Sequence, residues 1–177
     1  AGNERVLRAR LEDALFFWNE DNKKPLEDFN QGLPEVLFQE WLGSLQRKVQ
    51  RVTAIALYLC QETGWGDPEL VKRAAWLSKA DLLSSMVYEF PELQGIMGRY
   101  YARNSGEDPQ VAEAIFEHYL PRFAGDQLPQ SDIGALLSLA EKLHNLVGCF
   151  CIGIKPTGSQ DPYALRRQAL GVVHILL

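Results

Sequence analysis

The sequence has few cysteines and no long apolar run, and each shortage excludes a class of protein. Its three cysteines, Cys60, Cys149 and Cys151, are an odd number in apolar surroundings. This pattern indicates buried thiols in a reducing compartment, since a disulfide framework needs pairs. No run approaches the roughly 20 apolar residues of a membrane-spanning helix, and the N-terminal AGNERVLRARL lacks the apolar centre of a signal peptide. We therefore expect a cytoplasmic protein with no membrane partner.

Motifs for covalent hydrolysis and nucleotide binding are missing as well. No Gly-x-Ser-x-Gly turn exposes a nucleophilic serine, and the segment PTGS lacks the spacing of a phosphate-binding loop. His118, His144 and His174 each stand without a histidine four residues away or a pair of cysteines, which is the spacing that zinc sites use. The sequence therefore predicts no catalytic residue, no metal and no cofactor within this chain.

Composition favours a globular protein with at most a focused contact to nucleic acid. The chain has 177 residues, of which 46% are hydrophobic and 23% charged, so it can bury a core of its own. Its net charge of -5 argues against a protein that coats nucleic acid, because such proteins bind the phosphate backbone through a broad basic surface. We expect no DNA partner, and any RNA contact must use a local cluster of cations.

Apolar residues recur with the 3.6-residue period of α-helices along most of the chain, and no segments alternate as strands do. This predicts an all-α, multi-helix bundle. The predicted helices cover residues 4–22, 44–62, 68 onward, 91–103, 109–119, 132 onward and 162 onward. Three of them begin at an Asp-Pro step, which suits aspartate as N-cap and proline as first helical residue. A short extended piece is expected at residues 36–38.

Two helices have apolar stripes that predict which face is buried. In the longest helix the stripe consists of Ile133, Leu136, Leu137, Ala140, Leu143, Val147 and Phe150. In the last helix the expected inner face consists of Leu165, Ala169, Val172, Val173 and Leu176. Tyr163, Arg167 and His174 fall on the opposite face, with Arg166 on the flank.

The segment EFPELQGIMGRYYARNSGE carries two glycines within a predicted helix. Each costs about 1 kcal/mol relative to alanine in a helix interior, so both need a reason. One reason is close packing of a neighbouring helix against Gly95 and Gly98. The other is that Arg99, Tyr100 and Arg103 contact a nucleic-acid backbone, with arginine binding phosphate and tyrosine stacking on bases.

The segments KVQRVTAIALYLCQETG, AAWLSKADLL and LAEKL follow one another in order. They resemble the HD phosphohydrolase superfamily, whose motifs place histidines and aspartates around metal ions. The matching positions here are Lys48, Ala80, Asp81 and Glu141. A protonated lysine cannot ligate a metal and alanine has no ligand atom, so the resemblance implies an HD-like bundle with a degenerate metal site.

That resemblance leaves three possibilities for these positions. The Lys48 ammonium could lie beside Asp81 as an ion pair in a former active site. The same residues could instead be separate surface charges on different helices. A residual metal phosphohydrolase would use Asp81, Glu141 and His118.

Six further segments run in order along the chain: GNERVLRARLEDALFFW, FQEWLGSL, KADLLSSMVYEFPELQGIMGRYYA, AIFEHYLPR, LAEKLHNLVGCFCIG and KPTGSQDPYALRRQALGV. They closely resemble the β subunit of the bacterial-type heterotetrameric glycyl-tRNA synthetase. The resemblance implies an internal fragment of a longer subunit, in the cytoplasm or in a plastid if the source is a plant. One departure is AEKLH, with Glu141 and His144, where the family commonly has ADKLD.

The resemblance also implies partners and a division of labour. The partners are tRNA(Gly) and the α subunit in an α2β2 assembly, and ATP and magnesium are used by the α subunit. This chain is then a non-catalytic part of glycine–tRNA ligase that supports tRNA binding and assembly, or a purely architectural module. The expected domains are residues 1–43, an N-terminal helix with an irregular connection, and residues 44–177, the HD-like domain continuing into the next segment. The tRNA-binding candidates are Arg99, Arg103, Lys155, Arg166 and Arg167.

Overall fold

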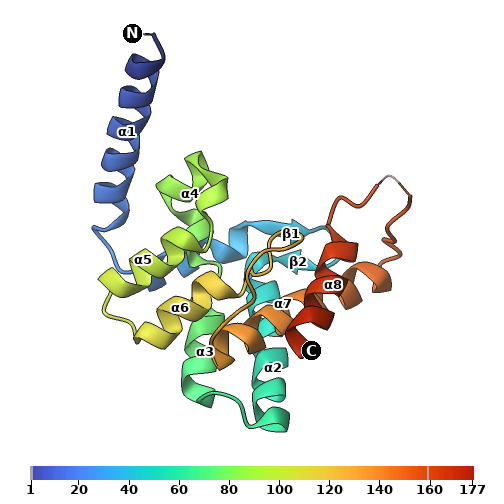
Figure 1. Cartoon of the computed structure of the whole chain (residues 1–177). Coiled ribbons are helices and arrows are strands. Elements are labelled where there is room, and N and C mark those ends of the chain that lie inside the picture. The colour runs from blue at the N-terminus through green and yellow to red at the C-terminus, as the bar shows by residue number, and fades with distance from the viewer. Residues whose placement is uncertain (1, 159) are drawn as a thin grey trace.

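The computed structural model describes residues 2–158 and 160–177, and it confirms the all-α prediction (Figure 1). The α-helices are α1 (Gly2–Asp21), α2 (Leu45–Thr63), α3 (Pro68–Leu77), α4 (Ser85–Glu89), α5 (Ile96–Asn104), α6 (Pro109–Glu117), α7 (Asp132–Cys151) and α8 (Leu165–Leu176). The 3-10 helices are η1 (Leu26–Glu35), η2 (Ala80–Leu83) and η3 (Pro91–Leu93). Strands β1 (Leu37–Gln39) and β2 (Gly43–Ser44) form a small antiparallel pair, in which Leu37 faces Ser44. The extended piece expected at residues 36–38 is thereby confirmed.

Capping residues begin the helices where the sequence predicts. The carboxylate of Asp67 accepts hydrogen bonds from the backbone amides of Glu69 and Leu70, and Pro68 is the first residue of α3. Asp108 caps α6 in the same way, and the Ser131 hydroxyl caps α7. These oxygens satisfy amides that have no partner within the helix, so the order of helices follows from local chemistry.

The single helix predicted over residues 91–103 is wrong. The structure has η3, then a break, and then α5. Gly95 lies at the break with φ +77, a conformation that side chains disfavour. A Cβ atom there would lie 2.5 Å from Cδ2 of Tyr119, so the break depends on a close approach by another part of the chain.

The last helix also departs from its prediction, because α8 begins at Leu165 and not at Pro162. Ala164 has φ 51, which interrupts the helix before that point. Asp161 nevertheless caps it, since its two carboxylate oxygens accept from the amides of Leu165 and Arg166 at 2.8 and 3.0 Å. Asp161 therefore accepts from the first amides of the helix as predicted, but the N-cap residue is Ala164 and the helix begins later than the proline.

The predicted inner face of α8 is only partly correct. Leu165 is buried, but Ala169, Val173 and Leu176 are exposed. The helix instead packs along a line through Gly171, where a Cβ atom would lie 2.8 Å from Cε of Lys142 on α7. Backbone, and not an apolar side chain, makes this contact.

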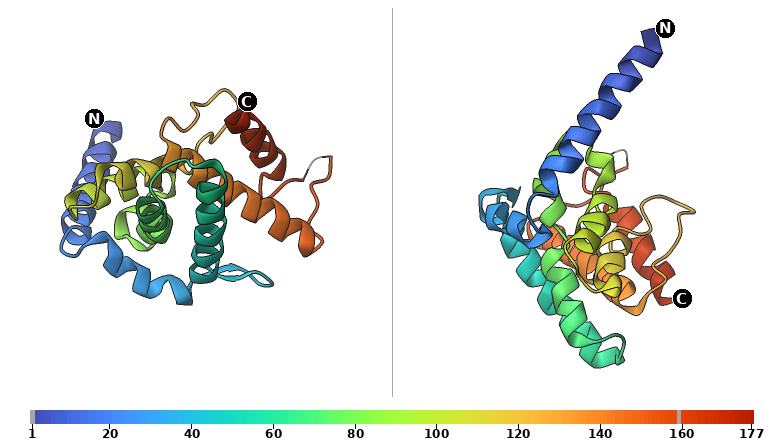
Figure 2. Two further views of the ribbon diagram at one scale, coloured as in Figure 1. Left: turned by 90° about the horizontal axis from the view of Figure 1, so that it is seen from below. Right: turned by 90° about the vertical axis from the view of Figure 1, so that its left-hand side faces the viewer.

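The core lies between α2, α3, α6 and α7, which pack side by side in Figures 1 and 2. Its fully buried members include Ala56, Val71, Ala74, Ala112, Ile115, Leu136, Leu137 and Ala140. Leu26 and Phe29 from η1 belong to the same cluster.

The predicted stripe of α7 fails at its end, since Val147 and Phe150 are exposed where the helix runs past the core. The domain boundary at residues 43 and 44 stays a prediction.

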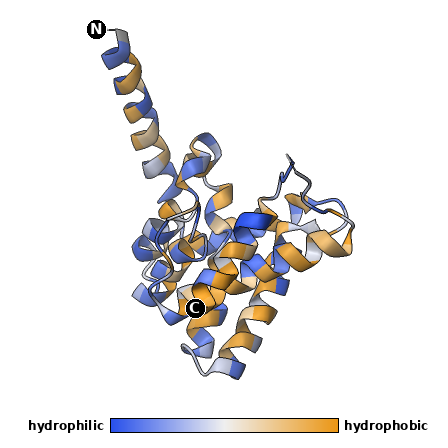
Figure 3. Ribbon diagram, turned by 45° about the vertical axis from the view of Figure 1, so that its right-hand side comes forward, coloured by the Kyte–Doolittle hydropathy of each residue, from blue (hydrophilic) through white to orange (hydrophobic). Residues whose placement is uncertain are grey.

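Helix α1 projects away from the other helices (Figures 1 and 2). Its C-terminal end is anchored by Asp21, whose carboxylate accepts from the amides of Ser85 and Met86 and from the Tyr101 hydroxyl. Apolar and polar residues follow one another along its ribbon (Figure 3). Those exposed to solvent are Val6, Leu7, Leu11, Leu15 and Phe16. Across the described residues, no helix combines the length and apolarity that crossing a membrane requires.

The cysteines only partly follow their prediction. Cys60 and Cys149 are buried free thiols, as expected. Cys151 is exposed, and the prediction of burial is wrong there. Two residues along an α-helix turn the side chain by about 200°, so Cys151 lies on the face of α7 opposite to Cys149.

Candidate functional site

A buried ionic cluster lies at the centre of the bundle around Glu141 of α7. The Nζ atoms of Lys48 and Lys79 lie 2.7 and 3.2 Å from the same carboxylate oxygen, Oε1 of Glu141. Burial alone would raise the pKa of Glu141, but the two ammonium groups hold it well below its usual range. Burial lowers the pKa of Lys79 to about 8, against the opposing pull of Glu141. Three chain segments are thus joined through one carboxylate.

Asp81 is fully buried beside this cluster and is held by backbone amides. Its Oδ2 accepts from the amides of Gly95 and Gly98 at 2.6 and 3.0 Å. A Cβ atom on Gly98 would lie 2.7 Å from Cγ2 of Ile115, so close packing accounts for that glycine. Burial raises the pKa of Asp81 to about 6, although the amide hydrogen bonds oppose this.

The predicted pairing of Lys48 with Asp81 is wrong, because Lys48 pairs with Glu141. The alternative of separate surface charges is also wrong, since Lys48, Asp81 and Glu141 are all buried. Ala80 is buried with them and supplies no polar group. The four positions that resemble the HD motifs therefore gather in the interior, with a lysine–glutamate ion pair among them.

His118 completes the cluster, although the sequence showed it standing alone. Its Nδ1 lies 2.6 Å from the carbonyl oxygen of Ile115, and Nε2 lies 2.8 Å from Nζ of Lys79. The carbonyl can only accept, so Nδ1 donates and Nε2 accepts from the ammonium. Burial, together with the charge of Lys79, lowers the pKa of His118 well below its usual value. The imidazole is therefore neutral and fixed in one tautomer.

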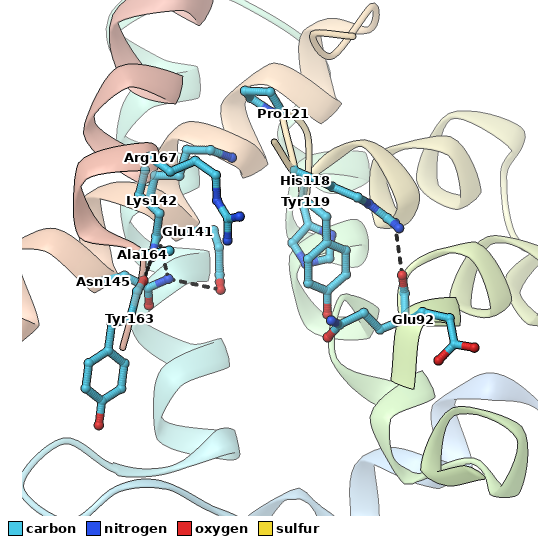
Figure 4. Close-up of a pocket in the computed structure, with 13 residues that line it drawn as sticks. Glu92, His118, Tyr119, Pro121, Glu141, Lys142, Asn145, Tyr163, Ala164 and Arg167 are labelled. Atoms are coloured by element: carbon cyan, nitrogen blue, oxygen red, sulfur yellow. Dashed lines mark hydrogen bonds between the residues drawn. The ribbon is translucent and has the colours of Figure 1, made fainter. Parts of the chain in front are cut away.

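A pocket of about 460 Å³ opens beside the cluster, between α7, α8 and the segment that follows α6 (Figure 4). It is lined by Glu92, Gln94, His118, Tyr119, Pro121, Arg122, Glu141, Lys142, Asn145, Tyr163, Ala164, Arg167 and Gln168. Nζ of Lys142 donates to the carbonyl oxygen of Leu120 at 2.7 Å and to Oγ of Ser138 at 2.5 Å. Burial lowers the pKa of Lys142 to about 8; Glu141 opposes that shift, while Lys79 and Arg167 add to it.

The sequence did not reveal Lys79 and Lys142 as members of the site, because their partners are far away in the chain. Lys79 meets a histidine 39 residues later, and Lys142 meets a carbonyl group 22 residues earlier. The available signal was a lysine inside an apolar helical segment, in WLSKADLL and in SLAEKLHNL. A buried lysine is rare unless it is paired, so such a lysine marks a polar site.

In the part of the chain that the structure describes, no group of three or more histidine, cysteine or carboxylate side chains is arranged to hold a metal ion. The nearest approach is the set Asp81, His118 and Glu141. Each of these already has a partner, in backbone amides, a lysine, or two lysines. These three side chains therefore bind ammonium groups and backbone amides of the chain itself.

Two of the five tRNA-binding candidates are paired with a carboxylate of the chain. Arg99 and Arg103 on α5 each lie 3.0 Å from a different carboxylate oxygen of Glu113 on α6. Arg99 also stacks over the ring of Phe116, with its guanidinium carbon 4.2 Å from the ring centre. Both arginines thus connect α5 to α6.

The other three candidates lie in the region of the opening turn of α8. Arg166 donates to the carbonyl oxygens of Gly158 and Thr157. Lys155 and Arg167 are exposed, and no carboxylate of the described residues lies within ion-pair distance of either. Of the five candidates only Arg167 lines the pocket, and Figure 4 shows its side chain extending into it.

Comparison with known proteins identifies the family. A family model described as glycyl-tRNA synthetase beta subunit matches residues 1–177. The chain belongs to this family. It is similar to glycine–tRNA ligase beta subunits over its whole length, with 70% identity to that of Syntrophomonas wolfei and 60% to that of Desulforamulus reducens. The beta subunit of Azotobacter vinelandii is 55% identical over the whole chain.

The chain spans 26% of the length of these glycyl-tRNA synthetase beta subunits. The family resemblance carried by segments such as EFPELQGIMGRYYA and PTGSQDPYALRRQALG is thereby confirmed. The HD-like label stays a prediction.

Proposed function

We propose that this chain is a non-catalytic helical module of a glycine–tRNA ligase beta subunit. It supports tRNA binding and subunit assembly for the ATP-dependent glycylation of tRNA(Gly). The observation that carries this proposal is the family match over every residue of the chain. Relatives named as glycine–tRNA ligase beta subunits supply the reaction and the substrate. The partners are the alpha subunit and tRNA(Gly), in an assembly of two alpha and two beta subunits.

The buried ionic cluster supports the non-catalytic part of the proposal. A metal phosphohydrolase would need open ligand positions at Asp81, His118 and Glu141. Two backbone amides and two lysines engage these side chains instead. Ammonium groups repel a divalent cation, and the family resemblance assigns the use of ATP and magnesium to the alpha subunit.

The exposed cations Lys155 and Arg167 are the best-placed tRNA contacts among the five candidates. Neither has a carboxylate partner in the described residues, whereas Arg99 and Arg103 share Glu113. An arginine already held by a carboxylate must give up that pair before it binds phosphate. The strongest contribution is therefore expected from the first turn of α8 and the loop before it.

The test is charge reversal at α8 in the intact ligase. The variant Arg166→Glu with Arg167→Glu should weaken binding of tRNA(Gly) in a gel-shift titration and reduce its dependence on salt. The matched control is Arg47→Glu with Lys72→Glu, which makes the same charge change at two exposed side chains on α2 and α3. Equal tRNA affinity in both variants would remove α8 from the tRNA-binding surface.

A purely architectural role is the second candidate, favoured by the apolar side chains exposed along α1. Such a surface is usually covered in an assembly. In this case Leu7→Ser with Leu11→Ser should prevent copurification with the alpha subunit, while charge reversal at α8 leaves tRNA affinity unchanged. Both roles include subunit assembly, so the tRNA measurement is the one that separates them.

A further inference from the structure

Three cations meet at the pocket beside Glu141 without a carboxylate of their own. They are Arg122, Lys142 and Arg167, all of which line it. Within residues 2–158 and 160–177, none of them lies within ion-pair distance of an acidic side chain. Lys142 donates only to a carbonyl and a hydroxyl, and an Arg122 guanidinium nitrogen donates to the carbonyl oxygen of Gln94 at 3.0 Å. The arrangement leaves positive charge uncompensated around one cavity.

The carboxylates at the same pocket do not balance that charge. Oε1 of Glu141 is shared by Lys48 and Lys79, which together already exceed its single charge. Glu92 is exposed. The charge of Arg167 also acts on Lys142, where it helps to lower the pKa. Like charges held this close in a partly buried site favour the binding of an anion.

Three polar atoms that belong to residues lining this pocket are shielded from solvent and have no hydrogen-bond partner in the described residues. They are the hydroxyl of Tyr119, Nε of Arg122 and Oε2 of Glu141. Such atoms are costly to leave unpaired. Burial, aided by nearby carboxylates, raises the pKa of the Tyr119 phenol well above its usual value, so it keeps its proton and can donate. The lining residues therefore hold two donors and one acceptor that have no partner in the described part of the chain.

We propose that this pocket binds a phosphate group that carries a hydroxyl, namely hydrogen phosphate or a protonated phosphomonoester. Arg122, Lys142 and Arg167 face its charged oxygens, and the Tyr119 hydroxyl donates to one of them. The ionised Glu141 accepts a hydrogen bond from the P–OH group through Oε2. A fully deprotonated oxyanion of similar size, such as sulfate, has no proton to donate and leaves that oxygen unpaired. The pocket should therefore prefer phosphate to sulfate.

Calorimetric titration of the intact beta subunit with inorganic phosphate and with sulfate tests the site without RNA. We expect saturable phosphate binding and at least tenfold weaker sulfate binding. Arg167→Gln should weaken phosphate binding at least tenfold. Arg47→Gln is the matched control, because that arginine is exposed on α2 and is absent from the pocket lining, so its phosphate affinity should be unchanged.

Tyr119→Phe provides a second variant that does not threaten the fold, since the hydroxyl it removes has no partner. It should weaken phosphate binding by about threefold or more while leaving the melting temperature unchanged, which matches the loss of one hydrogen bond. Absence of saturable phosphate binding would overturn the proposal. So would equal affinities for phosphate and sulfate, or equal effects of the Arg47 and Arg167 variants.

The source of the phosphate is decided by competition. A small phosphomonoester such as AMP, and RNA with or without a 5′ phosphate, are each added to the phosphate-loaded beta subunit. Displacement by 5′-phosphorylated RNA alone assigns the pocket to an RNA end, and displacement by AMP assigns it to a small metabolite. Both outcomes support the site. Because the phosphate titration contains no RNA, its failure is distinct from a failure of the tRNA-binding proposal.

Discussion

The ammonium of Lys48 and the carboxylate of Glu141 lie 2.7 Å apart in the interior, where their side chains are only 6% and 10% exposed. The pair joins α2 to α7 and is extended by Lys79 and His118. Nζ of Lys48 also donates to Oδ1 of Asn145 at 2.9 Å. Buried charges of this kind are tolerated because each has a partner, so the cluster is sensitive to the loss of any member.

The first prediction concerns that sensitivity. Glu141→Gln leaves two buried lysines without an anion and should lower the free energy of unfolding by about 3–5 kcal/mol. Urea denaturation measures the loss. The control is Glu4→Gln, which removes an exposed ion pair with Arg8 on α1 and should change stability by at most about 0.5 kcal/mol. Similar losses in the two variants would contradict a buried cluster.

The second prediction is a pH dependence due to Asp81. Burial raises its pKa to about 6 in the folded protein, against about 4 in an unfolded chain. Between these values the folded state holds a proton that the unfolded state releases. Its contribution to stability is therefore full below pH 4 and is lost as the pH rises through 6.

Comparison with Asp81→Asn isolates this effect, because the amide does not titrate. Relative to that variant, the wild-type free energy of unfolding should fall by about 2 kcal/mol between pH 4 and pH 6.5, since the full shift is worth about 1.4 kcal/mol per pKa unit and part of it is already lost at pH 4. Urea denaturation at the two pH values gives the difference. A gap that stays constant with pH would show that the Asp81 pKa is not raised.

The third prediction concerns the closeness of α5 to α6. Gly98→Ala places a Cβ atom 2.7 Å from Ile115 and 3.0 Å from Oδ2 of Asp81. The clash should destabilise the protein by about 1–3 kcal/mol, outweighing the gain of about 1 kcal/mol in helix propensity. Gly158→Ala is the control, because nothing lies within 4 Å of its Cβ position. Thermal unfolding should separate the two variants clearly.

The fourth prediction concerns the cap of α8. Asp161→Ala removes the acceptor for the amides of Leu165 and Arg166, so both amides should exchange with deuterium faster. The melting temperature should fall as well. Asp13→Ala, at an exposed position of α1, should leave exchange at these two amides unchanged. Unaltered protection in the Asp161 variant would mean that α8 is held by packing alone.

Local chemistry made the helix starts predictable from sequence. Asp67-Pro68 and Asp108-Pro109 carry both a cap and a first helical residue within two positions. The break at Gly95 was not predictable, because it depends on Tyr119 approaching from another segment. The same holds for the burial of α8, which follows from Gly171 meeting Lys142 and contradicts its apolar pattern.

The candidate site was also predictable only in part. The order of the HD-like motifs predicted that Lys48, Asp81 and Glu141 belong together, and all three lie buried in one region. Their pairing depends on distances across the bundle that periodicity does not encode, so Lys48 was assigned the wrong carboxylate. The sequence brought in His118 only as a residue of a residual metal phosphohydrolase, and its contact with Lys79 was missed because Lys79 lies on a different segment.

The contact at Gly171 determines where α8 can sit along its axis. Sliding the helix by one residue toward either end would bring Leu170 or Val172 against Lys142, where even a Cβ atom lies 2.8 Å from Cε. Helix α8 therefore packs against α7 at one position along its axis. Arg167 lies about one turn before Gly171, so the placement of its guanidinium over the pocket is set by a residue that has no side chain.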